Sequence, residues 1–199
     1  MMFGTLSRLI GFTRVTFPLL MILSIVLIGG IVVTAKADER MIENFTSNPE
    51  TRWIFFTDQV MGGVSNGETS FVREANESYV RLKGQVSTEN NGGFIQVRTK
   101  LENRIPQSAQ GIVLTVRGND KEYFLHVRTP WTVLPWQYYQ ASFQTTSDWK
   151  EVRIPFDSFK PSGRMLPTSL GPQSIRSIGV VAYGRNHDAD VSVASVSSY

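Results

Sequence analysis

The amino-acid sequence predicts an all-β protein, an antiparallel β-sandwich of nine or ten strands. Beyond residue 37, apolar residues recur at every second position in one segment after another, which is the period of a half-buried strand. Gly, Asn, Asp and Pro separate these segments at hairpin-like spacing, and no segment shows the helical period. A parallel sheet is therefore excluded, because parallel strands need long crossover connections.

A hydrophobic leader precedes this domain. Residues 15–33 are nearly all apolar, and Ala35-Lys36-Ala37 matches the small-x-small pattern that signal peptidase cleaves. We expect a signal peptide at 1–37, a single β-sandwich domain at 38–199, and a protein exported to the periplasm or the cell exterior. The alternative is an uncleaved membrane anchor at 15–33, which is about the length that spans a bilayer.

The charge of the mature domain is balanced. The chain has 20 Lys and Arg against 17 Asp and Glu, but Arg8, Arg14 and Lys36 lie in the leader, which has no acid. The mature part therefore has 17 bases and 17 acids, so net charge gives no reason to expect a nucleic-acid partner. The chain has no cysteine, which excludes disulfides and lipidation at a lipoprotein cysteine.

The alternation places the strands in order along the chain. The expected strands lie at 52–56, 69–73, 79–86, 93–101, 112–116, 123–127, 137–145, 149–155, 178–182 and 191–196. Turn residues predict hairpins at Asn76, Gly118-Asn119, Ser147-Asp148 and Asn186-His187-Asp188. The Pro-rich segment from 155 to 172 is expected to be a long connection with one short helical turn.

The stretch from Thr57 to Gly67 contains the most distinctive motif. Asn66-Gly67 predicts a type I′ hairpin turn. The glycine doublet Gly62-Gly63 indicates positive φ, or a neighbour too close for a Cβ, and a second doublet at Gly92-Gly93 opens a strand at Phe94. We expect a structural role for the residues of this motif, which are Asp58, Met61, Gly62, Gly63, Ser65, Gly92 and Gly93.

Two residues of the motif invite a chemical interpretation. Asp58 could contact a ligand or metal beside exposed N–H groups, but an Asx-type bond that fixes the turn is favoured. Ser65 lies in a G-x-S-x-G match, yet the residues after it alternate like a strand, whereas a nucleophile elbow needs a helix. Only His126 and His187 could act as base. We therefore predict no catalytic centre, no metal and no cofactor.

A polar sheet face is the predicted binding surface. If the alternation holds, one set of side chains on neighbouring strands points away from the core: Gln96, Arg98, Arg117, His126, Arg128, Tyr138 and Gln140. Arginine with aromatic residues is typical of recognition surfaces. Trp131 and Trp136, on a loop between Pro130 and Pro135, form either an exposed platform or a cap on the core.

Several motifs in order resemble the complex I intermediate-associated protein 30 family over about residues 45–196. They are Asp58-x-Val-Met-Gly-Gly-x-Ser65, Gly92-Gly93-Phe94, Arg117-Gly118, Tyr123, Arg128-Thr129, Tyr139-Gln140, Phe143, Trp149, Ile154-Pro155-Phe156, Phe159 and Ile178-Gly179. The resemblance implies a jelly-roll sandwich of the galactose-binding-like type, shared with carbohydrate-binding modules. It also implies a non-catalytic protein, since mitochondrial members are assembly factors for respiratory complex I.

The leader departs from the mitochondrial pattern, because a transit peptide would be amphipathic and rich in arginine. We therefore expect the fold to transfer from the family but not the whole assembly role. The leading hypothesis is an exported, non-enzymatic module that binds a protein partner. The alternative is a carbohydrate-binding module that uses the polar sheet face and the tryptophan loop. A membrane contact is expected only through an uncleaved leader.

Overall fold

In a computed structural model of the chain, the structure describes residues 39–74 and 77–199. The expected signal peptide, the alternative anchor and the turn at Asn76 lie outside these residues and remain predictions. Within the described ranges, no helix is long and apolar enough to cross a membrane.

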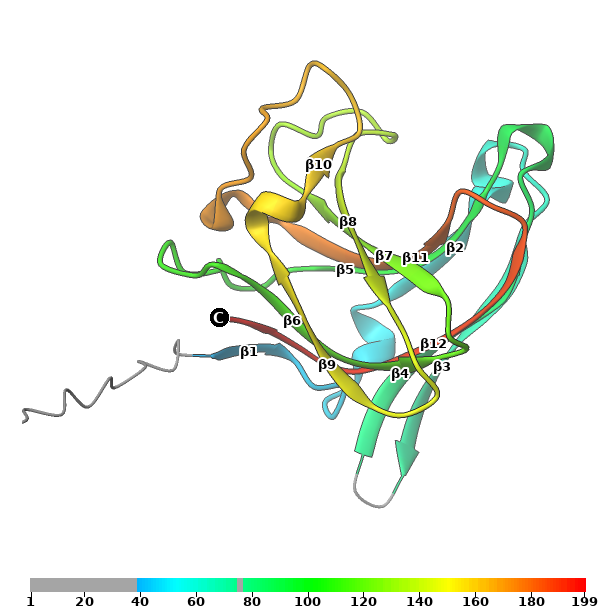
Figure 1. Cartoon of the computed structure of the whole chain (residues 1–199), viewed down its shortest axis with the longest axis horizontal. Helices are drawn as coiled ribbons and strands as arrows, with labels where there is room; N and C mark the ends of the chain where they lie inside the picture. The colour runs from blue at the N-terminus through cyan, green and yellow to red at the C-terminus, as the bar shows by residue number, and fades with distance from the viewer. Residues whose placement is uncertain (1–38, 75–76) are drawn as a thin grey trace, which may run out of the picture. The chain divides into compact units, whose positions relative to one another are not determined.

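In the described residues, twelve strands form two antiparallel sheets of six strands each, which confirms the predicted sandwich (Figure 1). Sheet A has the order β3-β4-β12-β6-β9, with β1 beside β12. Its strands are β1 (Arg40–Glu43), β3 (Asn66–Glu74), β4 (Glu77–Val86), β6 (Gly111–Gly118), β9 (Lys150–Pro155) and β12 (His187–Ser198).

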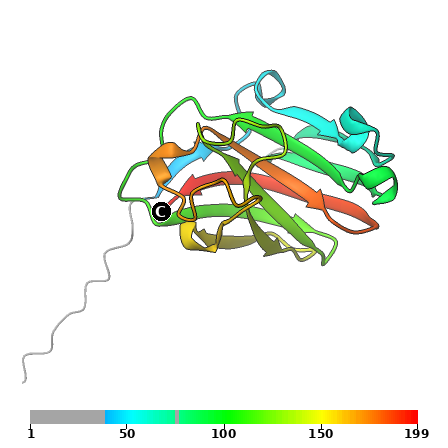
Figure 2. The same cartoon turned by 90° about the horizontal axis from the view of Figure 1, so that it is seen from above.

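Sheet B has the order β10-β8-β7-β11-β5-β2 and is the sheet that Figure 2 looks down upon. Its strands are β2 (Ile54–Thr57), β5 (Phe94–Lys100), β7 (Glu122–Arg128), β8 (Tyr139–Gln144), β10 (Lys160–Pro161) and β11 (Ser177–Tyr183). Single-turn 3-10 helices lie in the connections: η1 (Pro49–Thr51), η2 (Asp58–Met61), η3 (Glu89–Asn91), η4 (Phe156–Ser158) and η5 (Pro172–Ser174).

The hydrophobic core lies between the two sheets and follows the predicted alternation. On β5, Ile95 and Val97 are buried in the core, whereas Gln96 and Arg98 are on the opposite side of the strand. Tyr123 is wholly buried, and its hydroxyl donates to Asn119 Oδ1 at 2.6 Å and accepts from the Asp190 N–H at 2.7 Å. Burial raises the pKa of Tyr123 to about 12.

Three of the predicted hairpins are wrong. The strands on the two sides of Gly118-Asn119 are β6 and β7, which belong to different sheets. The same holds for β8 and β9 around Ser147-Asp148, and for β11 and β12 around Asn186. Alternation and turn residues show where the chain reverses, but they do not show whether it returns to the same sheet or crosses to the other one.

The predicted turn at Asn66-Gly67 is also wrong, because these residues open β3. They pair with Gln85 and Gly84 of β4. A Cβ on Gly67 would lie 2.6 Å from the Lys83 carbonyl oxygen and 3.2 Å from Ile95 Cδ1. The glycine is therefore needed for close packing of two strands under a core side chain, and this tertiary requirement overrides the local turn preference.

Candidate functional site

The motif between Thr57 and Gly67 is built around the carboxylate of Asp58. Asp58 is fully buried at the start of η2. Its Oδ1 accepts from the Ser65 N–H at 3.0 Å, and its Oδ2 accepts from the Ser65 hydroxyl and the Gly93 N–H at 2.5 Å each. The Phe94 N–H, at 3.2 Å from Oδ2, is a fourth donor. The carboxylate thus ties η2 to the start of β5.

The two glycine doublets pack on this carboxylate in the same way. Gly62 and Gly93 have positive φ angles of 92° and 129°. Their partners Gly63 and Gly92 instead approach Asp58 closely: a Cβ would lie 2.3 Å from Cγ in the first case and 2.4 Å from Oδ2 in the second. Each doublet therefore combines one residue that turns the backbone and one that leaves room for the carboxylate.

These contacts give the motif a structural role. Burial raises the pKa of Asp58, but the hydrogen bonds from Gly93, Ser65 and Phe94 outweigh it and hold the pKa below its usual value. Met61, by contrast, is exposed at the end of η2. Across residues 39–74 and 77–199, no three His, Asp or Glu side chains lie close enough together to hold a metal.

Ser65 is not placed as a nucleophile. It is fully buried, and its hydroxyl donates to Asp58 and accepts from the Ser87 N–H at 3.0 Å. Strand β3 starts at the next residue, so the strand–turn–helix geometry of a nucleophile elbow is missing. The bond to Ser87, 22 residues away, joins distant segments of the chain.

Six of the predicted surface residues lie together on the outer side of sheet B. The pairing register places Gln140, His126, Gly179 and Arg98 in one row across β8, β7, β11 and β5. The outward side chains of β2, β5, β7, β8 and β11 and of the residue before β8 are called the sheet B face: Ile54, Phe56, Phe94, Gln96, Arg98, Lys100, Glu122, Phe124, His126, Arg128, Tyr138, Gln140, Ser142, Gln144, Ser177, Gly179, Val181 and Tyr183.

Aromatic rings form a layer on the sheet B face. The His126 and Tyr138 rings are stacked, with centroids 4.0 Å apart and planes 10° from parallel. Tyr183 meets His126 and Phe124 edge-on, each with centroids 5.8 Å apart. Under this layer Val181 is wholly buried although it points away from the core. The face therefore has a small packed layer of its own rather than a solvated surface.

Two polar atoms in this layer are buried without a well-aligned hydrogen bond. They are His126 Nε2 and Gln140 Oε1, whose side chains are nevertheless close enough for Gln140 to act on the pKa of the ring. Burial lowers the pKa of His126 to about 4, with the neighbouring Gln140 acting against the shift, so the ring is neutral at pH 7.

The two arginines of the face are held in place differently. Arg128 donates from Nη2 to the carbonyl oxygens of Thr132 at 2.9 Å and Leu134 at 2.7 Å, so it fixes the loop between β7 and β8. The Arg98 guanidinium lies over the Phe56 ring, with Cζ 4.8 Å from the ring centroid. Burial lowers the pKa of both arginines, and for Arg98 the positive charge of Arg128 adds to the effect.

Arg117 does not belong to this face. It lies on β6 of sheet A, where its guanidinium contacts both the Tyr79 and the Trp149 rings, with Cζ 5.0 Å and 4.6 Å from the centroids. Its Nη2 also donates to the Tyr79 hydroxyl at 3.0 Å. The alternation correctly indicated that Arg117 points away from the core. It could not indicate which of the two outer faces receives the side chain.

Both tryptophans of the loop are exposed, so the alternative that they cap the core is wrong. Trp131 and Trp136 are each 66% exposed, and Val133 between them is 80% exposed. Ser162 binds this loop to the segment after β10, because its hydroxyl donates to the Trp136 carbonyl oxygen and accepts from the Tyr138 N–H. Met165, 81% exposed, lies in that second segment. The two loops stand at one end of sheet B (Figure 1).

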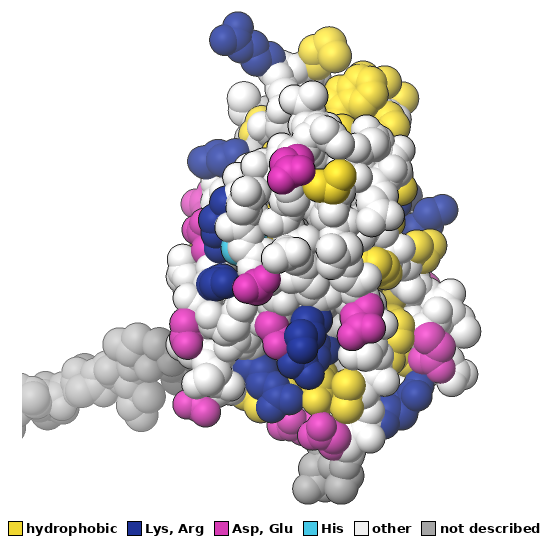
Figure 3. Space-filling view, turned by 90° about the vertical axis from the view of Figure 1, so that its right-hand side faces the viewer, with side chains coloured by type: hydrophobic (Ala, Val, Ile, Leu, Met, Phe, Trp, Pro, Cys, Tyr) yellow, Lys and Arg dark blue, Asp and Glu magenta, His cyan; other side chains and the backbone are white. Residues whose placement is uncertain are grey.

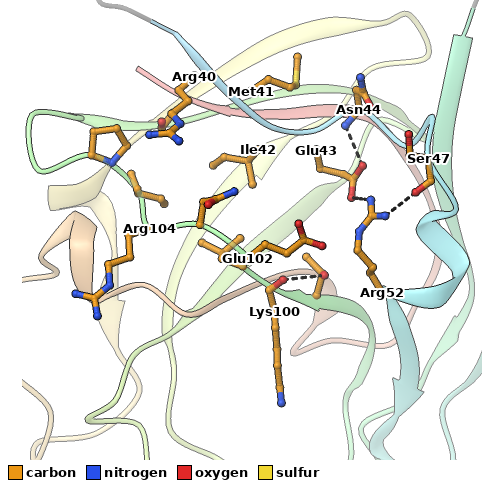
Figure 4. A pocket seen from close by; sticks show the side chains of 16 residues that line it. Arg40, Met41, Ile42, Glu43, Asn44, Ser47, Arg52, Lys100, Glu102 and Arg104 are labelled. Atoms are coloured by element: carbon orange, nitrogen blue, oxygen red, sulfur yellow. Dashed lines mark hydrogen bonds and ion pairs between the residues drawn. The ribbon is translucent and has the colours of Figure 1, made fainter.

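A cavity of about 350 Å³ lies elsewhere, between β1 and the segment after β5 (Figure 4). The Glu43 carboxylate at its rim accepts from Arg52 Nη2 at 2.6 Å, Trp53 Nε1 at 2.9 Å and the Phe45 N–H at 2.8 Å. Burial raises the pKa of Glu43, but these bonds outweigh it and lower the pKa. This carboxylate is thus fully engaged, and the cavity contains none of the predicted surface residues.

Some residues of the sheet B face were missed from the sequence. Tyr183 and Phe124 complete the aromatic layer around His126. Gly179 leaves space for the Gln96 side chain, whose Nε2 lies 2.3 Å from the place that a Cβ on Gly179 would take. The alternation that selected His126 and Arg128 also selects Phe124. The position of Phe124 on the strand, two residues before His126, was therefore the signal that could have found it.

Comparison with known families decides the identity of the domain. The family model "Complex I intermediate-associated protein 30 (CIA30)" matches residues 43–192. The chain belongs to the complex I intermediate-associated protein 30 family. This confirms the resemblance, and the matched region contains both the Asp58 motif and the sheet B face. No curated protein matches this member of the family.

Solved structures similar to this family member are carbohydrate-binding modules. A family 11 module from Clostridium thermocellum, in complex with a β-1,3-1,4-mixed-linked tetrasaccharide, is 18% identical, with a TM-score of 0.66 over 80% of this chain and 94% of the module. The family 11 module of a cellulosomal cellulase of the same organism is also 18% identical, with a TM-score of 0.65 over 80% and 93%. The likeness confirms the galactose-binding-like jelly-roll fold.

Proposed function

We propose that this domain is a non-catalytic carbohydrate-binding module, and that the sheet B face binds the glycan. The observation that carries the proposal is the layer of aromatic and polar side chains on this face, in which Tyr138 stacks on His126, Tyr183 lies beside both rings, and Gln140 is in register with His126. A sugar hydroxyl both donates and accepts hydrogen bonds, so it can pair with the partly exposed polar side chains of the face, such as those of Gln140 and Arg98.

The aromatic residues supply the apolar part of such a site. A pyranose ring has C–H groups on its faces and hydroxyls on its edge, and tyrosine likewise combines an apolar ring with a polar tip. Tyr138 and Tyr183 lie half-buried beside His126, with their ring centroids 6.4 Å apart. The family 11 module in complex with a tetrasaccharide has the same fold, but at 18% identity the proposal depends on the chemistry of this face alone.

The experiment is affinity electrophoresis of the soluble domain on a panel of polysaccharides. Gln140→Ala and Tyr138→Ala are expected to weaken binding at least 10-fold, since each removes a contact at the centre of the face. Gln85→Ala, an exposed residue of β4 on sheet A, is the matched control and is expected to bind like wild type. Failure of the wild-type domain to retain any glycan would contradict the proposal.

A protein partner is the second candidate, and the exposed hydrophobic side chains of the two loops favour it. Trp131, Val133, Trp136 and Met165 are exposed on adjoining segments, and aromatic residues with Met are enriched at protein interfaces. The sequence alone favours a protein partner. The sheet B face reverses this order, because it combines aromatic rings with polar side chains, as recognition of a sugar ring requires.

We further propose that the domain acts outside the cytoplasm, which the leader sequence supports. An exported protein does not meet the cytoplasmic or matrix side of respiratory complex I. The assembly role that the family name describes is therefore not proposed for this chain. The fold and a non-catalytic binding activity are the parts that carry over.

A further inference from the structure

We propose that the glycan bound by the sheet B face is anionic, with carboxylate or sulfate groups on its sugars that bind Arg98 and Arg128. This inference rests on the proposed function and names the chemical class of its ligand. It goes beyond the fold likeness, which says nothing about charge.

The distribution of charge between the sheets is the first observation. The strands of sheet B contain four bases, Arg98, Lys100, Arg128 and Lys160, and one acid, Glu122. Glu122 is the first residue of β7 and lies 4.0 Å from Arg185. In the strands of sheet A, bases and acids are equal in number: Arg40, Arg73, Arg81, Lys83, Arg117, Lys150 and Arg153 against Glu43, Glu68, Glu74, Glu77, Glu151, Asp188 and Asp190.

The ion pairs follow the same division. Five of the six salt bridges among the described residues include a residue from a strand of sheet A, such as Arg81 with Asp190 at 2.6 Å. On the side of the molecule that Figure 3 shows, basic and acidic side chains lie interspersed over the lower part. In the described chain, neither Arg98 nor Arg128 makes an ion pair. A neutral domain thus has one face with unbalanced positive charge.

The two guanidinium groups come from strands on either side of β11. Arg98 of β5 is in register with Gly179, and Arg128 of β7 is in register with Ser177, two positions earlier. The outward residues of β11 at these two positions are therefore small, and the polar side chain of Gln96 lies over Gly179. The effect of Arg128 on the pKa of Arg98 shows that the two charges act on each other. Two half-buried like charges without a counterion are unfavourable, and an oxyanion between them would remove that cost.

Both arginines are positioned before any ligand binds. Arg98 rests on the Phe56 ring, and no hydrogen-bond acceptor for its guanidinium occurs in the described residues. Arg128 is held through Nη2 by two loop carbonyl oxygens. A planar guanidinium presents a fork of N–H groups that matches carboxylate and sulfate oxygens. His126, neutral at pH 7, adds no charge to the face.

The test compares polygalacturonate with its fully methyl-esterified form, which has the same backbone without charge. Dextran sulfate distinguishes sulfate from carboxylate, and polyglutamate is an anion without sugar. The wild-type domain is expected to bind polygalacturonate or dextran sulfate at least 10-fold more tightly than the methyl ester or polyglutamate. Arg98→Gln is expected to lose this preference at an unchanged melting temperature, because its guanidinium holds no other residue by a hydrogen bond.

Lys83→Gln is the matched control, since it removes one exposed base from sheet A and is expected to bind like wild type. Raising the salt concentration should weaken anionic binding to wild type more steeply than to Arg98→Gln. Equal binding of the methyl ester and the acid, unaffected by Arg98→Gln, would overturn the inference and leave the glycan function intact. Equal binding of polyglutamate would overturn it as well. Retention of no polysaccharide at all would overturn the proposed function itself.

Discussion

At the scale of single residues, the buried carboxylate of Asp58 decides which substitutions its neighbours tolerate. Gly63→Ala is expected to lower the free energy of unfolding by about 3 kcal/mol or more, because its Cβ would lie 2.3 Å from Asp58 Cγ. Gly62→Asn is the control: it keeps a positive φ of 92° with nothing within 4 Å of a Cβ, and should cost only about 1 kcal/mol. Thermal melts measure both, and equal losses would show that close packing is not the reason for Gly63.

The same carboxylate predicts a dependence of stability on pH. The folded-state pKa of Asp58 is below its unfolded value of about 3.9, so its contribution is fully present above that pH. It is lost as the pH falls through the folded-state pKa, because the folded state must then take up a proton against its hydrogen bonds. Asp58→Asn should be less stable than wild type at pH 7, and the difference should shrink below about pH 4. A difference that stays constant between pH 7 and pH 3 would contradict this.

At the scale of the elements, the exposed tryptophans of the loop between β7 and β8 are expected to contribute little to the stability of the fold. Replacing Trp131 and Trp136 together with Ala should change the free energy of unfolding by less than about 1 kcal/mol, since both are mostly exposed. Trp53→Ala is the matched control. Trp53 is 4% exposed, packs on Phe45 and donates to Glu43, so its loss should cost about 3–5 kcal/mol. A double variant that melts as low as Trp53→Ala would show that the loop tryptophans support the core.

The elements also show what sequence reasoning could and could not supply. The period of two located nearly every strand, and it placed Gln96 and Arg98 opposite Ile95 and Val97 as the structure has them. It could not assign strands to sheets, so Arg117 was grouped with Arg98 although they lie on opposite outer faces. That assignment depends on which backbone pairs with which, a long-range property that local alternation does not carry.

The two shortest strands could not be predicted from the sequence, for a different reason. β1 and β10 have four and two residues, too few for a period to be recognised. The motif at Asp58 was recognised as structural, but the partner of its carboxylate across 35 residues of sequence, the Gly93 N–H, was not. The tertiary fold brings the hydrogen-bond donors to a buried carboxylate. In the sequence, the second glycine doublet was the only local sign of this contact.

At the scale of the whole molecule, the domain and its leader make separate predictions. The domain buries its core without disulfides, since the chain contains no cysteine, so it should fold equally well under reducing and oxidising conditions. Its melting temperature with and without dithiothreitol tests this. Because the chain offers no thiol to any oxidant, a shift on reduction would point to a contaminant in the preparation.

The leader is expected to determine the compartment in which the sheet B face is exposed. We predict that the mature protein begins at Asp38, after Ala35-Lys36-Ala37, and is recovered in soluble form outside the cytoplasm. Expression of the full chain in a bacterial host, fractionation and N-terminal sequencing give the answer. Ala37→Arg is the control, because signal peptidase requires a small residue before the cleaved bond, and this variant should stay in the membrane fraction with its leader intact. If the unmodified chain also stays there, residues 15–33 act as an anchor, and the sheet B face meets its glycan at the membrane surface.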